Sequence, residues 1–365
     1  MGLARYALPI HIRKGLARYA LPIHTYQLSE RRQPHMNTNI ISQPYSGAAE
    51  IPAIARLFAL CEAHDQTGEH IQEQDLHNDY SAPEYKPQRF VRLWRDQDES
   101  IIAAADIWPP RGQPGEADIP ELFVWFALHP EWRGQGIEDD ILAWAHSERE
   151  LLSQERGEQL ILSSMATSTE QQRHDFLQQH GFKAVRTFYT MEYQIPKHLQ
   201  PQHAAAPQNS GALPDGMSIK TSALTSEAYA ALHNIVWVDH YAYQPLTTEQ
   251  AAHERESPDY NAELDLSLHN SDDTAIGFCT CMISAEENAQ LQRKIGWVHR
   301  IGVRREYRGS GLGRVLLRAG VASILAAGMD SVRLGVDTSN ATGALELYTS
   351  EGFVPIYTRT RYMQV

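Results

Sequence analysis

The segment Arg308-Gly309-Ser310-Gly311-Leu312-Gly313 combines a positive charge with three glycines, and it lies between two predicted elements. An apolar, β-branched run at 295–303 predicts a strand before it, and apolar residues at helical spacing over 315–325 predict a helix after it. A glycine-rich turn that opens a helix directs several backbone N–H groups, and the positive end of the helix dipole, at one place. Glycine at 311 and 313 lets a bulky anion approach the backbone, because no Cβ intervenes. The sequence therefore predicts an anion-binding loop.

Two common phosphate loops do not match this segment. A P-loop closes with Lys followed by Ser or Thr, whereas Arg314 and Val315 follow the last glycine here. A dinucleotide fingerprint has a further glycine three residues after Gly313, where this chain has Leu316.

The residues after the loop extend the pattern. A predicted strand at 331–337 is followed by Asn340, by a helix pattern that contains Tyr348, and by Gly352-Phe353. In this order and spacing, the chain resembles the coenzyme A site of the GNAT acetyltransferase superfamily. The resemblance implies that the loop, from Arg308 to Arg314, holds the pyrophosphate of acetyl-coenzyme A. It also implies that Asn340 and Tyr348 face the thiol end of that cosubstrate.

A second, altered form of the plan occurs about 170 residues earlier, with a strand pattern at 123–130, the loop Arg133-Gly-Gln-Gly-Ile-Glu138 and a helix that ends at Gly181-Phe182. Such self-similarity indicates an internal duplication. The resemblance implies the α/β class, with two tandem GNAT-type domains that are each a twisted mixed sheet flanked by helices. We divide the chain into a basic repeated extension (1–36), a first domain (37–195), a linker (196–216) and a second domain (217–365).

The first copy has lost the residues that would favour a phosphate. Glu138 replaces the last glycine, and Asp139 and Asp140 follow it. A carboxylate about 5 Å from a phosphate costs roughly 1–3 kcal/mol, which exceeds the roughly 0.3–1 kcal/mol that a helix end contributes. Thr169 and Leu177 stand where the second copy has Asn340 and Tyr348. We therefore expect a degenerate, structural first domain.

Acetyl transfer to an amine needs three contributions from such a site. Backbone N–H groups at Ile301 and Val303, on the strand before the loop, are the candidates for oxyanion stabilisation and cosubstrate alignment. Tyr348 is the candidate proton donor to the leaving thiolate, because a phenol with a pKa of about 10 stays protonated at neutral pH. His299 is one candidate proton acceptor, since it titrates near neutrality and lies two residues before Ile301, on the same face of a regular strand.

Asp239 and His240 are the other two candidates for the proton acceptor. They lie between the first helices of the second domain, a region that forms an acceptor wall in the superfamily, and the segment 237–245 resembles mycothiol-synthase-like tandem acetyltransferases. The resemblance implies an N-acetyltransferase that moves an acetyl group from acetyl-coenzyme A to a primary amine of a small molecule or peptide, by direct attack in a ternary complex. The alternative is a non-catalytic acyl-coenzyme-A-binding or regulatory protein, which would have no use for a proton donor at Tyr348.

Composition restricts the remaining classes. The 365 residues carry a formal net charge of −13, which argues against nucleic acid as a partner. No apolar run approaches the length of a membrane span. Three cysteines are too few for a disulfide framework and fit a reducing cytoplasm, and no metal-binding motif occurs, so we expect no metal. The expected partners are acetyl-coenzyme A and an amine acceptor, with the chain as a monomer or a homodimer. Residues 2–11 are repeated identically at 15–24, and we expect this basic segment to lie outside the fold.

Overall fold

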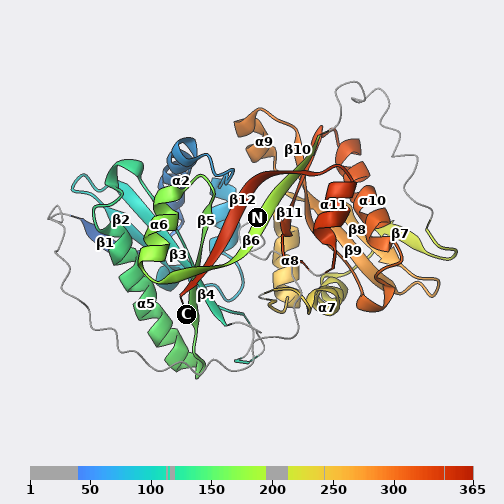
Figure 1. The fold of residues 1–365 in the computed structure, drawn as a ribbon, viewed down its shortest axis with the longest axis horizontal. Helices are drawn as coiled ribbons and strands as arrows, with labels where there is room; N and C mark the ends of the chain where they lie inside the picture. Colours follow the sequence, from blue (N-terminus) through green and yellow to red (C-terminus); the bar gives the residue numbers. More distant parts are fainter. Residues whose placement is uncertain are drawn as a thin grey trace.

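The computed structural model describes residues 40–111, 114–115, 120–194, 213–241, 243–340 and 342–364. The predicted extension at 1–36 and most of the predicted linker at 196–216 lie outside this part of the chain. Within it, the strands form one twelve-stranded mixed sheet, in the order β1-β2-β3-β4-β5-β12-β6-β11-β10-β9-β8-β7. Helices lie on both sides of the sheet, so the predicted α/β class is confirmed (Figure 1).

The first half of the chain supplies six of these strands. They are β1 (Ile41–Pro44), β2 (Val91–Arg95), β3 (Ile101–Trp108), β4 (Glu121–Leu128), β5 (Ile161–Thr167) and β6 (Phe182–Gln194). Its α-helices are α2 (Ile51–Asp65), α3 (Glu73–Tyr80), α4 (Pro87–Phe90), α5 (Ile137–Arg156) and α6 (Gln171–Gln179).

The second half repeats this arrangement. Its strands are β7 (Ser218–Thr221), β8 (Tyr260–His269), β9 (Ala275–Met282), β10 (Ile295–Val303), β11 (Ser331–Asp337) and β12 (Val354–Gln364). Its helices are α7 (Ser226–Trp237), α8 (Thr248–Glu256), α9 (Ala285–Leu291), α10 (Leu312–Ala326) and α11 (Ala344–Ser350).

The two halves exchange their last strands. β12, from the end of the second half, pairs with β5 of the first half, and β6, from the end of the first half, pairs with β11 of the second. β6 and β12 also pair with each other over most of their length, so they join the two halves at the centre of the molecule (Figure 1). The proposed division at 196–216 follows the chain, whereas the sheet runs continuously through both halves.

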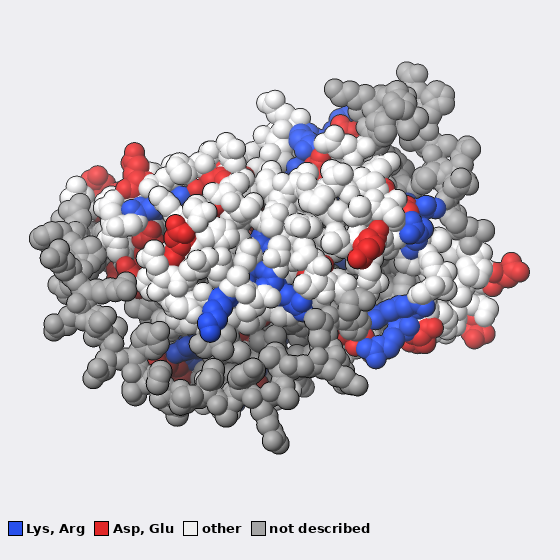
Figure 2. Space-filling view, viewed as in Figure 1, with Lys and Arg blue, Asp and Glu red and all other residues white. Residues whose placement is uncertain are grey.

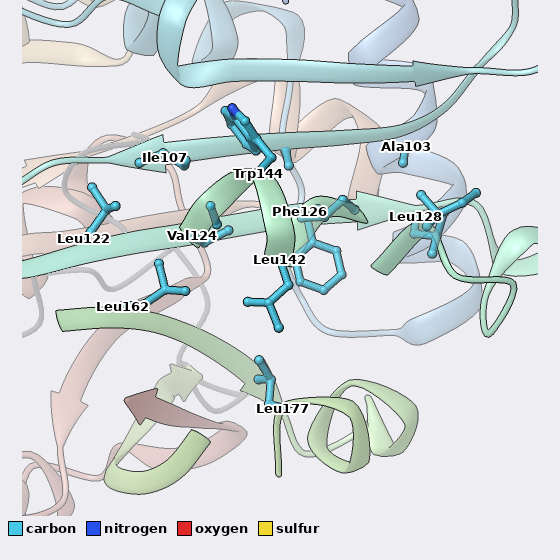
Figure 3. Close-up of a cluster of buried hydrophobic side chains, with 14 of the residues drawn as sticks. Ala103, Ile107, Leu122, Val124, Phe126, Leu128, Leu142, Trp144, Leu162 and Leu177 are labelled. Atoms are coloured by element: carbon cyan, nitrogen blue, oxygen red, sulfur yellow. The ribbon is translucent and has the colours of Figure 1, made fainter. Parts of the chain in front are cut away.

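Each half has a separate apolar core on either face of the sheet. In the first half, α5 and α6 cover one core, and α2 and α3 cover the other. In the second half, α10 and α11 cover one core, and α7 and α8 cover the other. Figure 3 shows the first of these cores, where Leu177 of α6 points toward the side chains of α5 and the sheet. Periodic apolar residues explain the helices: in α10 the buried residues recur at helical spacing, and they are Leu312, Leu316, Leu317, Gly320 and Ile324.

The surface of the described residues mixes charges of both signs. Acidic and basic side chains are interspersed on the face shown in Figure 2. In this part of the chain, no helix combines the length and the apolarity that crossing a membrane requires. The same residues contain no cluster of side chains suited to holding a metal ion.

Candidate active site

The central feature of the second half is a split between β10 and β11. These strands pair in parallel over Ile295–Val298 and Ser331–Leu334 only, while β10 continues to pair with β9 as far as Val303. Arg304 donates its N–H to Ile276 at 2.8 Å. Because such bonds alternate along an antiparallel strand, the N–H and C=O groups of Ile301 and Val303 point away from β9, toward the split. The predicted oxyanion-binding groups thus lie on an edge that β11 does not pair.

The predicted anion loop follows directly. Gly309 and Gly311 have φ values of +80° and +83°, which L-residues with a Cβ rarely adopt, and Gly311 caps α10 without help from a side chain. A Cβ placed on Gly309, Gly311 or Gly313 would meet no heavy atom within 4 Å, so the loop backbone is uncovered. Uncovered amides at a helix N-terminus suit the pyrophosphate of coenzyme A.

Other loop side chains are engaged within the protein. Ser310 donates to the carbonyl oxygen of Tyr307 at 2.8 Å, and Leu312 is buried in the core. Arg314 donates to Ser350 at 3.0 Å and also binds Glu351.

Arg308 anchors the loop to the rest of the domain. Its Nε donates to the carbonyl oxygen of Val303 at 3.0 Å, and its Nη2 donates to that of Val236 at 2.9 Å. Asp239 lies 3.4 Å from Nη1 of Arg308 and also accepts a hydrogen bond from Arg305 Nε at 3.1 Å. The Asp239 carboxylate therefore lies between two guanidinium groups at the base of the loop.

His299 occupies a β-bulge. The register between β10 and β9 shifts between Val298 and Arg300, whereas β3 and β4 in the first copy pair without a shift. β10 accordingly has nine residues and β4 has eight. The bulge corrects our expectation that His299 and Ile301 share a face: Ile301 packs on the α10 side, whereas His299 and Arg300 both line a pocket on the opposite side.

That pocket lies between the two halves of the chain and has an empty volume of about 690 Å³. Asn78 and Asp79 of α3 line it together with Glu254 of α8, His299 and Arg300. Arg300 Nη2 donates to Glu254 at 2.9 Å. Burial opposes ionisation of Glu254, but the Arg300 charge outweighs it and lowers the pKa of this carboxyl to about 2. Burial and the Arg300 charge lower the pKa of His299 well below its usual value, so its imidazole is neutral at pH 7.

The remaining predicted residues lie around the split. Tyr348, on α11, is only 6% exposed and packs on the opposite side of the sheet from His299. Burial, followed by the nearby Cys279, raises the pKa of Tyr348. The Asn340 side chain accepts a hydrogen bond from the Thr342 N–H at 2.8 Å in the turn before α11. The His240 ring stacks on Trp237, with centroids 4.2 Å apart.

Comparison with known proteins agrees with this geometry. The acetyltransferase (GNAT) family profile matches residues 229–353. The mycothiol acetyltransferase of Thermobispora bispora is 28% identical over 66% of this chain and 74% of its own length. That of Rothia mucilaginosa is also 28% identical, over 62% of this chain and 66% of its own length. A GCN5-related N-acetyltransferase from Sphaerobacter thermophilus superposes with a TM-score of 0.66 at 22% identity, covering 89% of this chain and 95% of that one. A tandem GNAT protein from the clavulanic acid biosynthesis pathway superposes with a TM-score of 0.62 at 14% sequence identity. The match covers 89% of this chain and 98% of that one. Residues 229–353 thus match the GNAT acetyltransferase family, and the chain as a whole resembles tandem GNAT acetyltransferases.

The first copy has the same loop conformation, but its own side chains contact the loop. Gly134 and Gly136 have φ values of +70° and +94°, and Arg133 binds the Leu128 carbonyl at 3.1 Å, as Arg308 binds that of Val303. However, Glu138 Oε1 accepts a hydrogen bond from the Gly134 N–H at 2.9 Å. One of the backbone amides of this loop is therefore hydrogen-bonded to a carboxylate of the protein itself.

A second side chain of the first copy, Arg173, lies in the split between β4 and β5. Arg173 of α6 donates to the carbonyl oxygen of Phe126, the residue that corresponds to Ile301, and lies 4.0 Å from the Phe126 ring centroid. Arg173 is also paired with Glu170 at 3.0 Å. Counting back from Gly181 and Gly352, Arg173 corresponds to Ala344 in the second copy. We did not predict a role for Arg173, although aligning the two copies shows an arginine in the first where the second has alanine.

Proposed function

We propose that this GNAT acetyltransferase transfers an acetyl group from acetyl-coenzyme A to a primary amine of a small molecule or peptide, in its second domain, by direct attack in a ternary complex. The observation that carries the proposal is the difference between the copies. The second copy combines an uncovered loop with an unpaired strand edge, whereas Glu138 and Arg173 engage the corresponding groups of the first. We propose that only the second copy binds the cosubstrate.

Each residue of the second copy has a proposed task. The backbone of the loop from Gly309 to Gly313 binds the pyrophosphate, and the Arg308–Asp239 pair holds the loop in place. When bound, acetyl-coenzyme A supplies the activated acyl group. The N–H groups of Ile301 and Val303 orient the thioester and stabilise the oxyanion, because they are fixed by the β9 ladder before the reaction begins. Tyr348 donates a proton to the thiolate that leaves, and the raised pKa of its buried hydroxyl keeps that proton in place at neutral pH.

We propose that the pocket beside the bulge receives the acceptor. It is lined by groups from both copies, so the degenerate first domain contributes a wall of the acceptor site. The neutral imidazole of His299 is suited to accept a hydrogen bond from an incoming ammonium. Relatives named mycothiol acetyltransferase support a small-molecule amine as one class of acceptor, with amino sugars, amino acids and peptides as the others to test.

Release of free thiol from acetyl-coenzyme A, measured across a panel of these amines, tests the proposal. We expect amine-dependent release by the parent chain and none by Gly313→Glu. Binding of acetyl-coenzyme A without thiol release for every amine would instead favour a non-catalytic acyl-coenzyme-A-binding protein.

A further inference from the structure

A buried carboxylate outside the predicted site lies at the mouth of the split. Asp337 is the last residue of β11, three positions after that strand stops pairing with β10 at Leu334. Its exposed fraction is 0%. A carboxylate that is fully removed from water is rare in proteins unless it is paired or functional.

The partners of Asp337 satisfy only part of its hydrogen-bonding capacity. Oδ1 accepts the N–H of Ser339 at 2.6 Å, whereas Oδ2 accepts no hydrogen bond. The Nε of Arg186, on the exchanged strand β6, lies 3.7 Å from Oδ2, and the Arg186 guanidinium lies over the Tyr241 ring at 4.9 Å. Burial outweighs the Ser339 hydrogen bond and the Arg186 charge and raises the pKa of Asp337 to about 6.

Asp337 and His299 lie on the same face of the sheet. Val332, Leu334 and Val336 pack in the core beneath α10 and α11, so the alternate residues of β11 face the other way. Arg333, one of these alternates, lies 3.7 Å from Glu287 of α9. Asp337 therefore faces the acceptor side from β11, as His299 and the Arg300–Glu254 pair do from β10.

The first copy has no carboxylate at this place. β5 and β11 each have seven residues, and their last residues, Thr167 and Asp337, lie opposite the corresponding positions Arg359 and Phe188 of the exchanged strands. The fold therefore tolerates a neutral residue here. The carboxylate occurs in the copy with the uncovered cosubstrate loop.

We infer that Asp337 is the proton acceptor for the amine, acting directly or through one bridging water; this rests on the proposed function. An N–H bond of R–NH₃⁺ breaks and an O–H bond forms at Oδ2, which leaves the nitrogen lone pair free to attack the acetyl carbonyl. The C–N bond forms and the carbonyl oxygen becomes the oxyanion; when the oxyanion collapses, the C–S bond breaks and the thiolate takes its proton from Tyr348. The tetrahedral nitrogen loses a second proton to solvent, and Asp337 and Tyr348 return to their starting states by exchange with water. Arg186 keeps the carboxyl ionisable despite its burial.

The test compares Asp337→Asn with the parent and with His299→Gln, which removes an imidazole that we propose to contact the acceptor, using the best amine from the panel. In the parent, kcat/KM should rise with pH with a midpoint near 6. In Asp337→Asn this rise, the acid limb of the pH profile, should be lost, and kcat/KM should fall about 100-fold at pH 7. The deficit should shrink as the pH approaches the pKa of the amine, because a free amine needs no proton acceptor. His299→Gln should keep the limb. Calorimetry should give the same affinity for coenzyme A in all three chains.

Three outcomes would overturn the inference. The first is an acid limb that survives in Asp337→Asn, and the second is a deficit that is equal at all pH values, which would indicate a structural role. Both leave the proposed function intact, because the parent still turns over. The third is a parent chain that acetylates no amine, which overturns the proposed function and this inference together.

Discussion

The carboxylate of Glu138 accepts a hydrogen bond from the backbone N–H of Gly134, at 2.9 Å, inside a loop built to present its amides to an anion. The corresponding position in the second copy is Gly313, where even a Cβ would meet no neighbour within 4 Å. One loop geometry thus occurs twice in the chain, closed by the protein's own side chain in the first copy and uncovered in the second.

Gly313→Glu should abolish binding of acetyl-coenzyme A. The new side chain enters the space that the phosphates need, and its charge alone costs roughly 1–3 kcal/mol at about 5 Å from a phosphate. Titration calorimetry should give one site per chain in the parent and none in the variant. Ala326→Glu is the control, because Ala326 is the exposed last residue of α10, at the end of the helix far from the loop. Binding that survives in Gly313→Glu would locate the cosubstrate elsewhere.

Glu138→Gly should not create a second site. It frees the Gly134 amide, but Asp139 and Asp140 still place negative charge in the first turn of α5, and Arg173 still binds the Phe126 carbonyl. We expect calorimetry to give one site per chain, as in the parent. A stoichiometry of two, in either chain, would show that the first copy accommodates the cosubstrate and that these side chains move aside.

Tyr348→Phe should lower turnover by about 100-fold, the scale of a lost general acid. Affinity for coenzyme A should change little, because the buried ring that packs in the core is kept. Burial raises the pKa of the hydroxyl, so the parent should lose no activity from Tyr348 ionisation below pH 10. The measurements are steady-state kinetics over a pH series and calorimetry. Equal turnover of parent and variant at every pH would eliminate Tyr348 as the proton donor.

Asp106→Asn should change how stability depends on pH. Asp106 is buried in β3 with no hydrogen bond to Oδ1, and burial, followed by the charge of Asp79, raises its pKa to about 8. Its pKa in the unfolded chain is about 3.9. The stability of the parent that depends on this carboxyl is therefore fully present below pH 4 and is lost as the pH rises to about 8. Asparagine does not ionise, so the stability of the variant lacks this dependence on pH.

Urea unfolding at a series of pH values measures this difference. The free energy of unfolding of Asp106→Asn, relative to the parent, should increase by roughly 1 kcal/mol per pH unit between pH 4 and 8 and then level off. A constant difference between the two chains over this range would mean that Asp106 ionises normally in the folded protein.

Most of the architecture could be predicted from residue order. The glycine loop, the strand and helix patterns around it and the internal duplication predicted a tandem GNAT chain of the α/β class, which is confirmed. This succeeded because glycine at positive φ, helical spacing of apolar residues and anion-binding amides are local properties of a segment. Glu138 is likewise a local signal, since it lies four residues from the amide that it binds. The roles of the individual site residues stay predictions.

Tertiary structure alone decided three features. The bulge at His299 depends on how β10 aligns with β9, and a single extra residue reverses the face on which a side chain lies. The exchange of β6 and β12 depends on which sheet edge each strand meets, and their own residues do not encode a partner. Asp337 is fully buried at the end of β11, where that strand pairs with β6 from the other half, and its neighbours along the chain do not indicate this burial. Local chemistry can be predicted from neighbours along the chain, whereas burial and pairing depend on residues that only folding brings together.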